Sequence, residues 1–157
     1  MSESDVPART IFDQLGELPQ VAALIDWTLV RLDQASDSIF LSFTAADEFT
    51  NPAGTVHGGF VTAMLDECMG SAIVGLTEAR FLPATVSMST DFIRPVRPGK
   101  VLGEGHITSM GTSSAFLEAK LRSPDGQILA RATGAFRLVP FELAVRNRPG
   151  LPESQPA

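Results

Sequence analysis

The stretch from Gly58 to Leu76 constrains the fold most, because it carries apolar residues on every side. It contains only two charged residues, Asp66 and Glu67, and no proline. A helix that is apolar all round is a buried helix. The stretch is too short and too rich in glycine to be a convincing membrane span. It therefore predicts a central helix around which a sheet wraps.

Alternation of apolar and polar residues predicts six strands on either side of this helix. They are expected over residues 26–32, 38–44, 84–93, 100–110, 112–122 and 127–139. Within the third strand, the alternation places Val86, Met88 and Phe92 on one face and Thr85 on the other. Two strands, one helix and four strands predict an α+β fold with a mostly antiparallel sheet.

The length of 157 residues is typical of one domain. We expect an N-terminal leader with a short helix over residues 1–25, the main domain over 26–140 and a Pro-rich tail over 141–157. The N-terminus shows no apolar export signal, and the single cysteine excludes an internal disulfide. A cytoplasmic location is therefore expected.

The net charge of -6 is concentrated in the N-terminal third of the chain. Residues 1–50 carry nine acids and two bases, whereas residues 51–157 carry nine acids and ten bases. Such a protein is a poor partner for nucleic acid or for an anionic membrane surface. Two histidines and one cysteine show no metal-ligand spacing, so no metal site is expected.

Two features of the central helix are candidates for a role in catalysis. The first amides of a helix are unpaired, and glycines at positions 58 and 59 would let a substrate carbonyl approach them. Alternatively, Gly58 and Gly59 only form a tight entry to the helix. Asp66 is an ionisable group on an apolar helix, where it could act as a general base or as a nucleophile. Alternatively, it is a structural carboxylate. Glu67 is expected to point elsewhere.

These residues form part of a larger pattern along the chain. The pattern comprises Asn51, Gly54, His57-Gly58-Gly59, Asp66 and Gly70, followed by Phe92-Ile93-Arg94-Pro95 and Gly99. It resembles the hotdog-fold thioesterases of the phenylacetic-acid-degradation type (PaaI-like), over residues 26–139. The resemblance implies a mostly antiparallel sheet around one buried helix. It also implies hydrolysis of a medium-chain or aromatic acyl-CoA thioester to the free acid and CoA.

The resemblance also implies roles for individual residues. Asp66 would be the general base or nucleophile, and the Gly58 amide would polarise the carbonyl. Asn51 would hold the thioester or the attacking water, although an Asn-Pro pair is also a common turn former. Thr85 would orient the Asp66 carboxylate.

Substrate contacts are expected from seven further residues. They are His57, Gly59, Phe60, Met64, Met88, Arg94 and Arg97. Arg94 and Arg97 are expected to meet the phosphates of CoA, or else to form a solvated charged turn. CoA is part of the substrate, so no separate cofactor is expected.

The spacing of Gly58 and Asp66 bears on the assembly. Eight residues of helix span about 12 Å, which is far for one carbonyl to contact both residues. A second subunit that supplies Asp66 would solve this problem, and the resemblance implies such a site at a dimer interface. A homodimer is expected, with a tetramer as a dimer of dimers. The competing functions are a hotdog hydratase or dehydratase and a non-catalytic acyl-CoA-binding protein.

Overall fold

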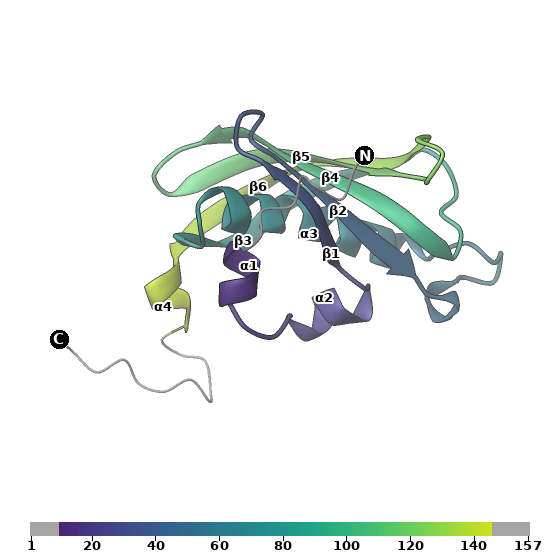
Figure 1. The fold of residues 1–157 in the computed structure, drawn as a ribbon. Helices are drawn as coiled ribbons and strands as arrows, with labels where there is room; N and C mark the ends of the chain where they lie inside the picture. Colours follow the sequence, from purple (N-terminus) through teal and green to yellow (C-terminus); the bar gives the residue numbers. More distant parts are fainter. Residues whose placement is uncertain (1–9, 146–157) are drawn as a thin grey trace.

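A six-stranded antiparallel sheet packs on one long helix (Figure 1). The computed structural model describes residues 10–145. The strands are β1 (Thr28–Asp33), β2 (Ser38–Ala45), β3 (Phe81–Phe92), β4 (Gly99–Met110), β5 (Ser114–Arg122) and β6 (Ile128–Pro140). Their order across the sheet is β1-β2-β4-β5-β6-β3. The predicted order of elements is confirmed, and the strand bounds lie within three residues of those expected.

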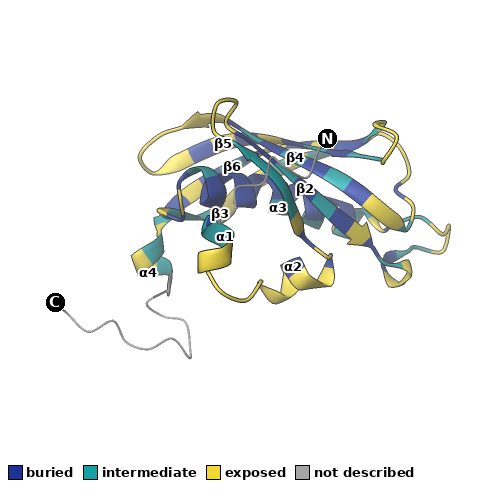
Figure 2. Ribbon diagram, viewed as in Figure 1, coloured by how far each residue is buried: buried dark blue, intermediate teal, exposed yellow. Residues whose placement is uncertain are grey.

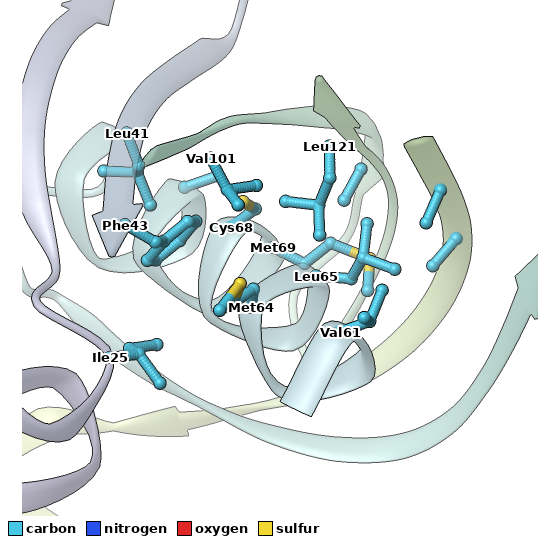
Figure 3. Close-up of a cluster of buried hydrophobic side chains, with 14 of the residues drawn as sticks. Ile25, Leu41, Phe43, Val61, Met64, Leu65, Cys68, Met69, Val101 and Leu121 are labelled. Atoms are coloured by element: carbon cyan, nitrogen blue, oxygen red, sulfur yellow. The ribbon is translucent and has the colours of Figure 1, made fainter. Parts of the chain in front are cut away.

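Helix α3 (Gly58–Leu76) begins and ends where the sequence predicts. Its buried side chains include Met64, Leu65 and Cys68, which lie with Phe43 of β2 and Leu121 of β5 in the core (Figure 3). The helix is long and apolar enough to cross a membrane, but more than half of it (56%) is buried inside the fold. Figure 2 shows this buried helix beneath the sheet. It is therefore a core helix.

Two glycines of β4 let the sheet approach α3 closely. A Cβ atom at Gly103 would lie 2.5 Å from the Cys68 sulfur, and one at Gly105 would lie 2.1 Å from the Cys68 carbonyl oxygen. Neither position has room for a side chain. The absence of these side chains fixes how deeply α3 sits against the sheet.

The N-terminal segment covers α3 on the side away from the sheet (Figure 1). It contains two short helices, α1 (Ile11–Gln14) and α2 (Gln20–Leu24). The Phe12 ring packs on Trp27 with ring centroids 5.0 Å apart. A final short helix, α4 (Phe141–Val145), follows β6. Residues 1–9 of the expected leader and 146–157 of the expected tail lie outside the described residues.

Strand β3 differs from its predicted alternation. Its register against β6 shifts between Thr85 and Ser87, so Val86 is the extra residue of a β-bulge. Thr85 and Met88 consequently both pair with residues on the helix side of β6, Phe136 and Gly134. Phe92 pairs with the buried Ala130 and so shares this side with Met88, as predicted. Val86 (70% exposed) lies on the surface, so the expected faces were wrong for Val86 and Thr85. The bulge brings Thr85 to the helix side.

Candidate active site

The head of α3 is organised by His57. This residue is the N-cap, and its Nδ1 accepts a hydrogen bond from the Gly59 amide at 3.0 Å. The Gly59 amide is thereby occupied. Among the described residues, no acceptor contacts the Gly58 amide. Gly58 is therefore the position at which the helix head offers a donor to a ligand.

A cavity of about 360 Å³ opens at this helix head. Gly58 lines it together with Phe92, Ile93 and Arg94 from the end of β3 and the turn that follows. A Cβ atom at Gly58 would lie 3.3 Å from the Phe92 ring, so the ring stands directly over the glycine. We call this space the helix-head cavity.

Asp66 lies two turns further along α3 and is half-buried. The Thr85 hydroxyl donates a hydrogen bond to its Oδ1 at 2.9 Å. This contact joins the two residues that the sequence singled out as a carboxylate and its orienting hydroxyl. Oδ1 thus accepts one hydrogen bond, which orients the carboxylate. The second oxygen, Oδ2, has no hydrogen-bond partner among the described residues.

A second cavity, of about 370 Å³, lies between α3 and the N-terminal segment. We call it the N-terminal cavity. Asp66 and Thr85 line it, together with mostly apolar residues that include Phe12, Leu18 and Trp27. It shares no lining residue with the helix-head cavity. Sequence reasoning missed this cavity, because its walls come from segments far apart in the chain.

Glu67 does not point away from Asp66 as expected. Both carboxylates line the N-terminal cavity. Burial raises the pKa of the Glu67 carboxyl above its ordinary value, and the nearby Asp66 charge adds to the increase. Two adjacent acids therefore face the same largely apolar space.

The Asn51 side chain is engaged within its own loop. Its Oδ1 accepts hydrogen bonds from the Ala53 and Thr55 amides at 3.0 and 3.3 Å, and its Nδ2 donates to the Thr55 hydroxyl at 2.9 Å. In this chain the residue forms the turn that leads to His57. The turn-former interpretation accounts for all of these contacts.

The expected apolar contacts are dispersed. Phe60 stacks on Phe49 with ring centroids 4.0 Å apart. Met64 has no exposed surface and lies in the core (Figure 3), so the structure does not place it in either cavity. Met88 is half-buried against the core and lies outside both cavities.

Arg94 and Arg97 are exposed in the turn between β3 and β4. Arg94 lines the helix-head cavity, and one of its guanidinium nitrogens donates to the Ile128 carbonyl at 2.7 Å. Its remaining donors can reach an anion at the cavity rim. No side chain of residues 10–145 forms an ion pair with Arg97.

A protein-family comparison decides the class of the chain. Residues 53–130, which contain α3 and the strands β3 to β5, match the model of the thioesterase superfamily. The chain belongs to the thioesterase superfamily. The expected PaaI-like hotdog fold is confirmed, and the activity class is thioester hydrolysis.

Individual relatives of this superfamily member agree with that assignment. An inferred esterase of Saccharolobus solfataricus is 22% identical over 133 residues, which cover 85% of this chain and 93% of the relative. The solved structure of an inferred thioesterase from Ralstonia eutropha, related to phenylacetic acid degradation, has a TM-score of 0.75 and 26% identity. The matched region covers 82% of this chain and 99% of the Ralstonia eutropha chain.

The PaaI protein from the phenylacetic acid degradation operon of Escherichia coli shares the fold. Its TM-score is 0.72 at 14% identity, with 82% of this chain and 90% of that chain covered. At this identity the likeness concerns the fold alone.

Within residues 10–145, no group of three metal-ligating side chains is found.

Proposed function

We propose that this thioesterase hydrolyses acyl-CoA thioesters that carry a medium-chain or aromatic acyl group. The observation that carries the proposal is the hydrogen bond between Thr85 and Asp66 at the edge of a largely apolar cavity. A carboxylate whose orientation is fixed, beside space for an acyl group, suits hydrolysis of an apolar thioester.

The reaction begins at the thioester carbonyl. The Gly58 amide donates to the carbonyl oxygen and stabilises the negative charge that develops there. In one route, Asp66 removes a proton from water as the water oxygen bonds to the carbonyl carbon. In the other, the Asp66 carboxylate bonds to that carbon itself, and water then hydrolyses the resulting anhydride. In both routes the carbon–sulfur bond breaks, and CoA leaves as a thiolate that takes up a proton.

Two copies of the chain would complete one site. Strand β3 is an edge of the sheet and carries both half-sites: Thr85 beside Asp66 within the strand, and Phe92 beside Gly58 at its end. An antiparallel pairing of two β3 edges, centred between Met88 and Ser89, would place Thr85 of one copy opposite the Phe92 end of the other. Asp66 of one subunit would then face the helix-head cavity of the second. This geometry supports a homodimer, and a dimer of dimers is an extension of it.

The CoA moiety would lie at the exposed turn after β3. Arg94 and Arg97 offer guanidinium groups suited to its phosphates. We place the protein in the cytoplasm, where acyl-CoA substrates are free.

The hydratase alternative has less support in the geometry. It requires a histidine paired with the helix carboxylate, but neither cavity formed by residues 10–145 has a histidine in its lining. His57 is engaged in capping α3, and His106 lies within hydrogen-bonding distance of the Ser36 carbonyl.

The proposal is tested by measuring free-thiol release from a panel of acyl-CoA thioesters. The wild type should cleave apolar acyl-CoA substrates, and Asp66→Asn should lower kcat by at least about 100-fold, as expected for loss of a general base. Asp37→Asn is a matched control, because Asp37 lies in an exposed turn with a φ of 49° that asparagine also adopts. Binding of acyl-CoA without turnover in the wild type would establish the non-catalytic alternative instead.

A further inference from the structure

The N-terminal cavity runs along one face of α3. Asp66, Gly70 and Val74 all line it, and their spacing of four residues places them in one row on the helix surface. From Asp66 to Val74 the row is about 12 Å long at the rise of an α-helix. Gly70 has no side chain, so it leaves the middle of the row open. Thr85 lies at the Asp66 end and is exposed, so that end of the cavity faces solvent. The cavity therefore leads from the candidate catalytic carboxylate to Val74.

The opposite wall is formed by the N-terminal segment. Phe12, Leu15, Leu18 and Ala22 face the cavity from this side. The wall is anchored at Trp27, whose indole N–H donates to the buried Ser71 hydroxyl of α3 at 3.1 Å. The segment is thus held against the helix, and its apolar side chains line the space over the row.

The size and charge of the cavity limit what it can hold. Its volume of about 370 Å³ is more than twice the roughly 150 Å³ that accommodates a benzene molecule in an engineered protein cavity. The charged residues in its lining are Glu17, Asp66 and Glu67, all of them acidic. An acyl group with a terminal carboxylate would be repelled, whereas an uncharged apolar group would fit.

We propose that the acyl group of the substrate lies along the row from Asp66 to Val74. Val74 and the N-terminal segment limit its length, and the acidic lining excludes a charged group. This inference rests on the proposed thioesterase function. The acyl carbonyl lies at the Asp66 end, and the far end of the chain meets Val74 and the apolar residues of the N-terminal segment. The preferred substrate is an uncharged, medium-chain or phenyl-substituted acyl thioester.

The first test changes the Val74 end of the cavity. Val74→Phe should shorten it and Val74→Ala should lengthen it. With a series from butanoyl-CoA to hexadecanoyl-CoA, Val74→Phe should lower the ratio of kcat/KM for decanoyl-CoA to that for butanoyl-CoA by at least about 10-fold, because one methylene in a pocket changes specificity by this amount or more. Val74→Ala should move the optimum to longer chains.

The matched control is Val21→Phe. Val21 belongs to the N-terminal segment but is exposed and does not line the cavity, so this change should leave the chain-length profile as in the wild type. If the wild type hydrolyses thioesters but both Val74 variants keep its chain-length profile, the acyl group lies elsewhere and the inference is wrong. If the wild type cleaves no thioester, the proposed function has failed.

The second test measures binding without turnover. Trp27 is the single tryptophan of the chain and lines the cavity, so its fluorescence reports on the occupant. S-decyl-CoA, a thioether that cannot be hydrolysed, should change the emission of both the wild type and Asp66→Asn. CoA alone should not. A saturable change with CoA alone, or no change with S-decyl-CoA, would overturn the placement of the acyl group even where hydrolysis is observed.

Discussion

Removing the Gly58 amide is the sharpest single perturbation of the proposed site. Gly58 is the first helical residue of α3, a position where proline is tolerated because the N–H makes no bond within the helix. His57 has φ −59° and ψ 138°, which is a conformation that readily precedes proline. Gly58→Pro should therefore keep the helix head intact and delete the donor.

The expected loss follows from the role of that donor. Removing one oxyanion-hole hydrogen bond costs about 10²- to 10³-fold in kcat, or ~2.7–4 kcal/mol. Gly58→Ala is the matched control, because it keeps the N–H but adds the same Cβ atom 3.3 Å from the Phe92 ring. It should cost only a few-fold.

The assay is steady-state thioester hydrolysis with thiol detection, with thermal melting to verify that each variant is folded. Equal losses in Gly58→Pro and Gly58→Ala would mean that bulk at the glycine, not its amide, is responsible. Near wild-type activity of Gly58→Pro would refute the assignment of the carbonyl to the helix head.

Three further predictions concern the carboxylates and the packing. Thr85→Val should lower kcat about 10-fold, or ~1.4 kcal/mol, because the hydrogen bond that orients Asp66 is lost. Thr85→Ser keeps a hydroxyl and should restore kcat. An unchanged kcat in Thr85→Val would show that the bond has no catalytic role. Glu67→Gln should raise the melting temperature at pH 7, because the raised pKa of Glu67 means that its ionised form destabilises the fold. This gain should shrink as pH falls through the raised pKa of the folded state and vanish below the ordinary pKa of glutamate, and a gain that persists in acid would contradict the cause. Gly105→Ala should destabilise the fold by about 3 kcal/mol or more in denaturant unfolding, because the added Cβ would lie 2.1 Å from a backbone carbonyl oxygen of α3. Gly111→Ala, whose Cβ would lie 3.6 Å from its nearest neighbour, should be close to neutral, and equal losses in both variants would refute the packing argument.

The architecture was predictable because its signals are local. The limits of α3 follow from an apolar stretch that begins after His57 and ends before a polar turn, and the structure reproduces them. The inward and outward residues of β6 follow from the alternation of its sequence, which the burial pattern repeats from Ala130 to Leu138. In both cases each residue's environment depends on its neighbours in sequence.

The features that sequence reasoning missed depend on distant segments. The bulge at Val86 arises from the register of β3 against β6, and no turn or proline marks it in the sequence. Glu67 faces the same cavity as Asp66 because α1 and α2 fold back over α3. The glycines of β4 could have signalled a close helix contact, since two of them, Gly103 and Gly105, are spaced to face the same side of the strand.

The pairing of Asp66 and Thr85 shows what the family pattern added. Nineteen residues separate them, and no periodicity links them, yet the structure joins them by a hydrogen bond. By contrast, Met64 was expected in the pocket because of its apolar character alone. It lies in the core, because apolar character does not distinguish a core face from a cavity wall.

The central claim is that each active site combines Asp66 of one subunit with Gly58 of another. The most direct measurement is the activity of dimers formed by co-expressing Asp66→Asn with Gly58→Pro. Each variant alone should be nearly inactive. In a random mixture, half of the dimers are mixed and contain one intact site of two, so about a quarter of the wild-type activity should return. If both residues act within one chain, no intact site forms in any dimer, and the mixture will be as inactive as its parents.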